Sequence, residues 1–182
     1  MSVTIYVEGS GDTESTLRSC RQGFAKYCAK IAPVGKRPRV VACGGRDQAF
    51  DKFIRAVTQV HPGDICVLLV DAEAPMTSAT PIVHLHNRDG WAFPDDLNGH
   101  RVFLMVRAME AWFLADREAL AEYYDGGFRQ DRLPGRPDDI EMIRKDDLEP
   151  ALVRATRDTR TKHTYHKTRH GFALLEMIAP AK

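Results

Sequence analysis

The chain has 182 residues, and its 26 lysines and arginines almost balance its 25 aspartates and glutamates, which leaves a formal net charge of +1. This length suits one domain with a buried core, and an apolar fraction of 43% is ordinary for a soluble globular protein. No apolar run is long enough to span a bilayer, and the first residues lack the features of a signal peptide. We therefore expect a cytoplasmic protein without a membrane segment, and the charge balance alone does not identify a nucleic-acid binder.

Short apolar runs alternate with helical patterns in the first part of the chain. Apolar residues recur at spacings of three and four from Leu17 to Ile31, as in an amphipathic helix. Asp12 or Thr13 could cap this helix, and Asp47 is the expected cap of a second one. Strands and helices that alternate with short links are typical of right-handed parallel crossovers. We therefore predict an α/β, Rossmann-like fold with a central, mostly parallel sheet of about four strands flanked by helices. The predicted strands are Val3–Val7, Arg39–Cys43, Ile65–Val70 and Arg101–Val106.

The second part of the chain is expected to be irregular at first and then helical. Residues 74–100 are predicted to be a long irregular loop, with 82–86 as the only candidate for local order. Asp116 is expected to begin a helix. We predict a single domain over residues 1–182, with a core to about residue 125 and a basic, helical C-terminal extension from about residue 138. The predicted helical segments here are Met109–Asp116, Arg117–Tyr124, about 147–157 and about 169–179.

The cysteines and histidines give no recognisable metal or redox motif. Because Cys20, Cys28, Cys43 and Cys66 form no CxxC pair, we expect them to be small buried hydrophobic residues rather than zinc or redox groups. The His84-x-His86 pair is expected to be a loop or edge feature, and the histidines near the C-terminus lack an HxxxH motif with an acidic partner.

Acidic side chains follow two of the predicted strands. Glu8 comes directly after the first strand, and Asp71-x-Glu73 follows the third. Ligands of parallel sheets bind in the crevice beyond the carboxyl ends of the strands, and alternate residues of an extended segment share one side. Taken singly, each carboxylate could be a solvated turn residue. Together they would repel one another unless a cation bound, and hard oxygen ligands favour Mg²⁺ or Mn²⁺. We therefore predict a metal centre formed by Glu8, Asp71 and Glu73.

Two further residues are candidates for the same site. Glu110 follows the fourth strand at the start of an apolar helical segment, where it could contact the active site or simply favour the helix dipole. Lys167 is the candidate for a phosphate or leaving-group contact. It belongs to a basic C-terminal set that could neutralise a phosphodiester backbone or form a solvated helix face. This basic set comprises Arg154, Arg157, Arg160, Lys162, Lys167 and Arg169.

These motifs resemble a known family pattern. A Glu-Gly after the first strand and Asp-x-Asp/Glu after the third resembles the Toprim domain of topoisomerases, primases and the overcoming-lysogenization-defect nucleases. Nearly the whole chain resembles, more specifically, a Toprim-like bacterial family of unknown function that is often found in mobile or phage-defence neighbourhoods beside an ATPase gene. The segments that carry this resemblance are 7–13, 69–73, 105–116 and 165–167.

The resemblance implies a Toprim-like fold and a Mg²⁺- or Mn²⁺-dependent nuclease in bacterial defence, acting on DNA rather than on RNA or a nucleotide second messenger. In that scheme Glu8 is a general acid/base or ligand, and Asp71 and Glu73 are the metal-binding pair. Glu110 and Lys167 match prominent positions to which the Toprim pattern assigns no role. Glutamate at 73 replaces the commoner aspartate, which leaves the number and geometry of the metals open. Since no Walker loop is present, control by ATP would come from an ATPase partner. A homo-oligomer is also open.

Three rival readings use the same acids differently. A phospho-receiver domain places acids after its first and third strands, but it has an adjacent acidic pair where this chain has Glu8 alone. A phosphatase that forms an aspartyl-phosphate requires an aspartate there. A regulatory or partner-interaction module with a vestigial metal site is the remaining alternative.

Overall fold

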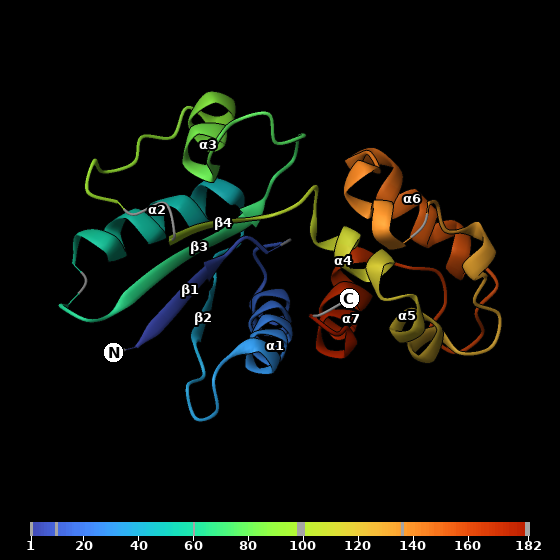
Figure 1. Cartoon of the computed structure of the whole chain (residues 1–182). Helices are drawn as coiled ribbons and strands as arrows, with labels where there is room; N and C mark the ends of the chain where they lie inside the picture. The colour runs from blue at the N-terminus through green and yellow to red at the C-terminus, as the bar shows by residue number, and fades with distance from the viewer. Residues whose placement is uncertain (1, 10, 60, 98–100, 136, 181–182) are drawn as a thin grey trace.

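The protein forms one parallel sheet flanked by helices (Figure 1). This computed structural model describes residues 2–9, 11–59, 61–97, 101–135 and 137–180. The sheet has the order β2-β1-β3-β4, and all three pairings between neighbouring strands are parallel. The predicted α/β fold with its central parallel sheet is therefore confirmed. The strands are β1 (Val3–Val7), β2 (Arg39–Ala42), β3 (Ile65–Asp71) and β4 (Val102–Met105).

Helices cover both faces of this sheet. The first helix, α1 (Glu14–Ile31), packs against one face, while α2 (Arg46–Thr58) and α3 (Pro81–Asp89) pack against the other. Neighbouring side chains of β3 show the alternation, since Leu69 joins the apolar cluster with α1 and Leu68 joins the cluster with α2. Both faces of the sheet thus carry helices, as is usual for a parallel sheet, although the face with α1 is covered only in part.

Helix α3 lies where an irregular loop was predicted, so that prediction was wrong over residues 81–89. The Thr80 hydroxyl accepts a hydrogen bond from the Val83 amide at 3.3 Å, Pro81 is the first helical residue, and Gly90 ends the helix with φ 71°. This cap, proline and glycine are typical helix boundaries. The helix is too short for its apolar periodicity to show. Residues 98–100 of the expected loop lie outside the described residues.

The cap of α2 differs from the predicted one, and one of the two residues predicted as possible caps of α1 is its cap. Helix α2 begins at Arg46, because Gly45 is its cap and the Gly45 amide donates to the Gln48 side chain at 3.0 Å. Asp47 is therefore not the cap but lies in the first turn of the helix. For α1, Thr13 is the cap and accepts a hydrogen bond from the Thr16 amide at 3.3 Å.

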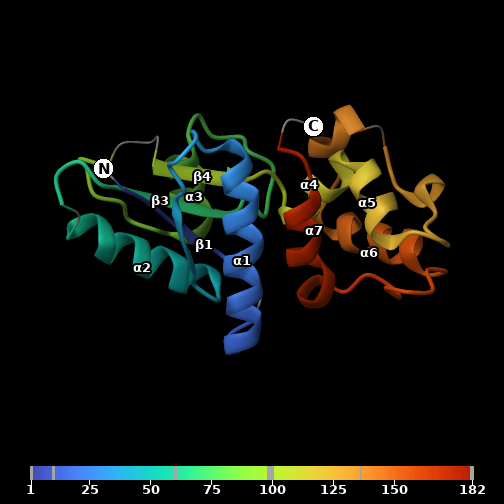
Figure 2. The same ribbon diagram turned by 90° about the horizontal axis from the view of Figure 1, so that it is seen from below.

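The chain after β4 forms a helical lobe (residues 107–180), distinct from the sheet lobe (residues 2–106) in Figures 1 and 2. Asp116 caps α5, as predicted, because its side chain accepts from the Ala119 amide at 3.2 Å. The lobe contains α4 (Met109–Ala115), α5 (Arg117–Tyr124), the 3₁₀ turns Gln130–Arg132 and Pro137–Met142, α6 (Lys145–Thr156), a π-helical turn (Lys167–Gly171) and α7 (Phe172–Met177).

The last predicted helix, over about 169–179, is replaced by the π-helical turn and the short α7. The turn is held at its start by the His166 amide, which donates to Nδ1 of the buried His170 at 3.0 Å. Helix α6 begins at Lys145, two residues before the predicted start, and acidic residues follow in its first turn, where they complement the helix dipole.

The two lobes meet where α1 and α7 lie side by side (Figure 2). Gly23 of α1 makes this close approach possible, since a Cβ atom there would lie 2.7 Å from the carbonyl oxygen of Phe172. A larger residue would push the helices apart.

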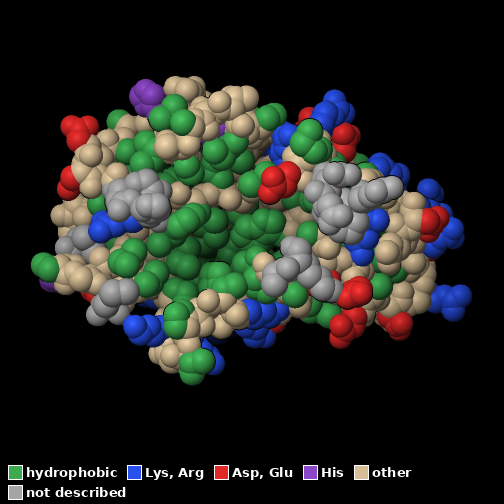
Figure 3. All heavy atoms as spheres, viewed as in Figure 1, with side chains coloured by type: hydrophobic (Ala, Val, Ile, Leu, Met, Phe, Trp, Pro, Cys, Tyr) green, Lys and Arg blue, Asp and Glu red, His purple; other side chains and the backbone are tan. Residues whose placement is uncertain are grey.

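The sheet face that carries α1 remains partly open. Figure 3 shows apolar side chains gathered in a hollow over β1 and β3. Ile5 and Leu69 are only half-buried there, and Phe103 of β4 is 48% exposed. Among the described residues, no helix combines the length and apolar character needed to cross a bilayer.

The four cysteines are buried, as predicted. Burial raises the pKa of Cys20 to about 12 and that of Cys28 to about 11. Both thiols therefore stay protonated at neutral pH, which suits small core residues.

Candidate metal centre

The three carboxylates of the predicted metal centre lie together at the carboxyl edge of the sheet. Glu8 follows β1, Asp71 is the last residue of β3, and Glu73 comes two residues later. One oxygen from each carboxylate lies within 4.8 Å of the oxygens from the other two. Their convergence follows from the pairing of β1 with β3, in which Val7 is the partner of Leu69.

Glu73 reaches the cluster by a different route from the predicted one. The expectation was that Asp71 and Glu73 share one side of an extended segment, but β3 ends at Asp71 and Glu73 has a left-handed backbone with φ 65°. The turn is held by backbone hydrogen bonds to the segment after β4. The Ala72 amide donates to the Met105 carbonyl at 2.9 Å, and the Glu73 amide donates to the Arg107 carbonyl at 3.2 Å.

Each of the first two carboxylates has one oxygen engaged. Oε2 of Glu8 accepts from the Asp71 amide at 3.2 Å and from Nη1 of Arg46 at 3.2 Å. Oδ1 of Asp71 accepts from the Met109 amide, at the start of α4, at 3.1 Å. Within the described ranges, Oε1 of Glu8 and Oδ2 of Asp71 have no hydrogen-bond partner, so each residue has one oxygen available to a cation.

Glu73 is paired with basic side chains instead. Its Oε1 contacts the ammonium group of Lys145, and its Oε2 lies 3.6 Å from Nη2 of Arg88. The negative charge of the cluster is thus partly compensated by the protein itself.

Asp71 is the most perturbed of these acids. Its side chain is almost completely buried, and burial, together with the charges of Glu8 and Glu110, raises the pKa of its carboxyl to about 7. Lys167 and Lys145 oppose that rise. A carboxyl group with this pKa is half protonated near neutral pH, and a bound cation would favour its ionised form.

Glu110 lies outside the carboxylate cluster and holds Lys167. Glu110 is only 3% exposed, accepts a hydrogen bond from the Tyr165 hydroxyl at 3.2 Å, and lies 3.3 Å from the Lys167 ammonium. Burial alone would lower the pKa of Lys167, but Glu110 first and Asp71 second raise it above its ordinary value. Lys167 therefore stays charged at neutral pH.

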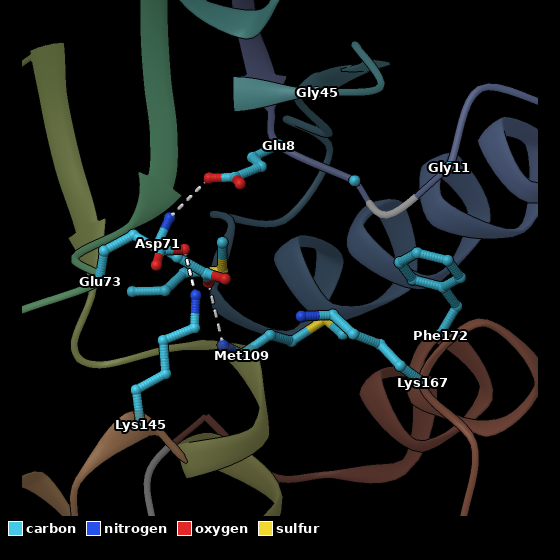
Figure 4. Close-up of a pocket in the computed structure, with 11 residues that line it drawn as sticks. Glu8, Gly11, Gly45, Asp71, Glu73, Met109, Lys145, Lys167 and Phe172 are labelled. Carbon is cyan, nitrogen blue, oxygen red and sulfur yellow. Dashed lines mark hydrogen bonds and ion pairs between the residues drawn. The ribbon is translucent and has the colours of Figure 1, made fainter. Parts of the chain in front are cut away.

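The carboxylates and the lysines line one cavity of about 220 Å³, and Lys145 is in direct contact with Glu73 there (Figure 4). Glu8, Asp71 and Glu73 reach it from the sheet lobe, and Lys145 and Lys167 reach it from the helical lobe. Of the six residues in the predicted basic set, Lys167 alone lines this cavity.

Lys145 and Arg46 are among the site residues that sequence reasoning missed. Each is the first residue of a helix, where a positive charge opposes the helix dipole. A positive charge at this unfavourable position indicates an anionic partner elsewhere in the fold. The position of each residue at a helix start was therefore the sequence signal that could have identified it. His84, expected to be a loop or edge feature, is buried on α3 with Nε2 2.9 Å from the carbonyl oxygen of Ala72, between the two acids of the motif.

Comparison with known proteins assigns the chain to a family. The model of a domain of unknown function, DUF4276, matches residues 7–182. The chain belongs to this family. Neither a search of curated proteins nor a search of solved structures gave a match. The matched DUF4276 region contains every residue of the candidate centre, and the family description states no activity.

Proposed function

We propose that this DUF4276 protein is a metal-dependent nuclease of Toprim type that hydrolyses phosphodiester bonds in DNA. The observation that carries the proposal is the set of three carboxylates within 4.8 Å of one another in a cavity that two lysines also line. Carboxylates can bind a metal ion, and nearby cationic groups can neutralise a negatively charged substrate that binds to this metal. A phosphodiester is such a substrate.

The residues present fit a Mg²⁺ or Mn²⁺ ion. All the converging ligand atoms are carboxylate oxygens, which such hard cations prefer, and Glu8 and Asp71 each have one oxygen available. When bound, a divalent cation supplies Lewis-acid chemistry, polarising a phosphoryl oxygen and lowering the pKa of water.

The lysines would hold the substrate. Lys167 keeps its charge at neutral pH, so it suits neutralisation of a phosphate oxygen rather than proton transfer. Lys145 reaches the same cavity from α6 and would bind a second phosphate oxygen after leaving Glu73. The exposed basic residues Arg157, Arg160 and Arg169 of the helical lobe could extend contact along the nucleic-acid backbone.

The resemblance to Toprim nucleases supports DNA as the substrate and a place in bacterial defence. It also supports an ATPase as the partner. Because the sequence has no Walker loop, any requirement for ATP would come from that partner.

A second candidate function is a non-catalytic, metal-binding regulatory module. The pairing of Glu73 with both Lys145 and Arg88 favours it, since these ion pairs neutralise part of the cluster without a metal.

Plasmid cleavage distinguishes the two functions. The purified chain is incubated with supercoiled plasmid and Mg²⁺ or Mn²⁺, alongside Glu8→Ala, Asp71→Ala and the control Asp51→Ala, which removes an exposed carboxylate of α2. We expect metal-dependent nicking or cutting that falls at least about 100-fold in both site variants and is unchanged in the control. Metal binding without cleavage, with or without an ATPase partner, would support the regulatory module instead.

A further inference from the structure

Arg46 lies behind the candidate metal centre in a fixed orientation. Its side chain is 14% exposed. It forms a bidentate ion pair with Asp89 at the end of α3, with Nε 3.0 Å from Oδ1 and Nη2 2.7 Å from Oδ2. Two parallel hydrogen bonds of this kind fix the plane of the guanidinium group.

An aromatic side chain supports the same guanidinium group. The Arg46 guanidinium carbon lies 5.0 Å from the centre of the Trp91 ring. Trp91 is itself held, stacked on Phe50 with ring centres 4.4 Å apart and donating from Nε1 to Asp47 at 3.2 Å. The position of Arg46 is therefore set by α2, α3 and the segment after α3 together.

The remaining nitrogen of Arg46 points into the metal centre. Nη1 donates to the carbonyl oxygen of Asp71 at 2.6 Å and to Oε2 of Glu8 at 3.2 Å. Since the Asp71 amide also donates to Oε2, this oxygen has two donors. In the described part of the chain, Oε1 of Glu8 has none.

We propose that Arg46 is a positioning residue that restricts Glu8 to binding a metal through Oε1 alone and thereby selects Mg²⁺ against Ca²⁺. Mg²⁺ requires a compact octahedron of single oxygen ligands, whereas Ca²⁺ accepts six to eight oxygens and often takes both oxygens of one carboxylate. Because Oδ1 of Asp71 is also engaged, the site has few oxygens to offer a larger ion. The inference rests on the proposed metal binding and adds the device that sets its selectivity.

The ratio of the two affinities isolates this role. Loss of a positive charge beside the cluster would strengthen the binding of both divalent ions, so a change in one affinity alone would be ambiguous. A ratio of the Ca²⁺ and Mg²⁺ dissociation constants cancels that shared effect and reports the geometry.

The test is calorimetric titration of the whole chain with Mg²⁺ and, separately, with Ca²⁺. In Arg46→Met we expect the ratio to shift at least about tenfold towards Ca²⁺, and in Asp89→Asn by about threefold in the same direction, because the arginine is retained but less firmly held. Arg46→Lys keeps the charge but loses the planar guanidinium group and its paired hydrogen bonds, so its ratio should resemble that of Arg46→Met. The control Arg55→Met removes an exposed arginine from the same helix and should leave the ratio unchanged.

Three results would overturn the inference. They are an unchanged ratio in Arg46→Met with a native thermal melting curve, a wild-type ratio in Arg46→Lys, or the same shift in Arg55→Met. If Arg46→Met does not fold, Asp89→Asn decides, and an unchanged ratio there counts against the role. A ratio shift without plasmid cleavage would support the inference while the nuclease proposal fails, and the reverse pair of results would do the opposite. A wild-type chain that binds neither cation would reject both.

Discussion

The sheet lobe and the helical lobe contribute opposite charges to one cavity, and they position them by different means. Glu8 and Asp71 are fixed by backbone pairing, because the ends of β1 and β3 are hydrogen-bonded neighbours. Lys145 and Lys167 reach the cavity from a helix start and from a π-helical turn of the other lobe. Glu8 and Asp71 are therefore placed by the topology of the sheet, whereas the positions of the two lysines depend on how the two lobes are packed together.

This difference predicts a division of labour. Changes in the sheet lobe should affect metal binding, and changes in the helical lobe should affect the rate while metal binding persists. The sharpest separation comes from the buried pair of Glu110 and Lys167. Replacing the lysine alone would leave a buried carboxylate without its cation, so both residues are changed together.

The double variant Glu110→Gln/Lys167→Met is expected to cut plasmid about 10- to 100-fold more slowly, because a positive charge is lost from the phosphate site. Its Mg²⁺ affinity, measured by calorimetry, should stay within about threefold of wild type, since the three clustered carboxylates are intact. Lys36→Ala, which removes an exposed lysine of the sheet lobe, serves as the control. Loss of metal binding in the double variant would break the proposed division between the lobes.

Asp71 gives the sheet lobe a pH dependence in the absence of metal. Its pKa is raised from an ordinary value of 3.8 to about 7 on folding. The stabilisation from holding this proton is complete below the unfolded pKa and is lost as the pH rises through the folded pKa. The free energy of unfolding should therefore fall between about pH 4 and pH 7 by a few kcal/mol less any opposing contributions, as measured by urea unfolding in EDTA.

Mg²⁺ competes with the same proton, so its apparent affinity should rise about tenfold per pH unit up to about pH 7 and then level off. Asp71→Asn should abolish the Asp71 part of the stability change, and Asp51→Asn should not. Identical stability curves for wild type and Asp71→Asn would show that Asp71 does not take up this proton.

A substitution at Gly23 tests whether the positions of Lys145 and Lys167 depend on the packing of the two lobes. In Gly23→Ala the new Cβ would lie 2.7 Å from the Phe172 carbonyl oxygen, so α1 and α7 must separate. Overpacking of 1–3 kcal/mol is partly offset by the better helix propensity of alanine, and we expect a net loss of about 1 kcal/mol in thermal or urea unfolding. Cleavage should fall by about threefold because Lys167 lies just before Phe172, while Mg²⁺ affinity is unchanged. Arg18→Ala, on an exposed turn of α1, is the control. An equal loss of Mg²⁺ affinity would mean that the carboxylates of the sheet lobe also depend on the contact between α1 and α7.

The same difference explains what the sequence revealed. The convergence of Glu8 with Asp71 could be predicted, because apolar strand patterns locate strand ends and parallel pairing brings them to one edge. The left-handed turn at Glu73 could not, since no glycine or asparagine marks it and backbone bonds to the segment after β4 impose it.

The contributions of helices were harder to predict. The roles of Lys145 and Arg46 can be recognised only once the helix starts and the packing around them are known. A basic residue at a helix start is nevertheless a sign in the sequence that an anionic partner lies nearby. Helix α3, which carries His84 and Asp89 to the back of the site, is a nine-residue segment whose boundary residues were more informative than its apolar pattern.

The π-helical turn that begins at Lys167 makes the length of the chain critical at this point. A π turn contains about one residue more than an α turn. Deleting a single residue between Thr168 and Gly171 would allow the segment to relax into an ordinary α-helix continuous with α7. Each residue of such a helix turns the chain by about 100°, so the lysine would swing away from the cavity even though no side chain of the site had been changed. Insertions and deletions, rather than substitutions, are the changes that this short segment is least able to absorb.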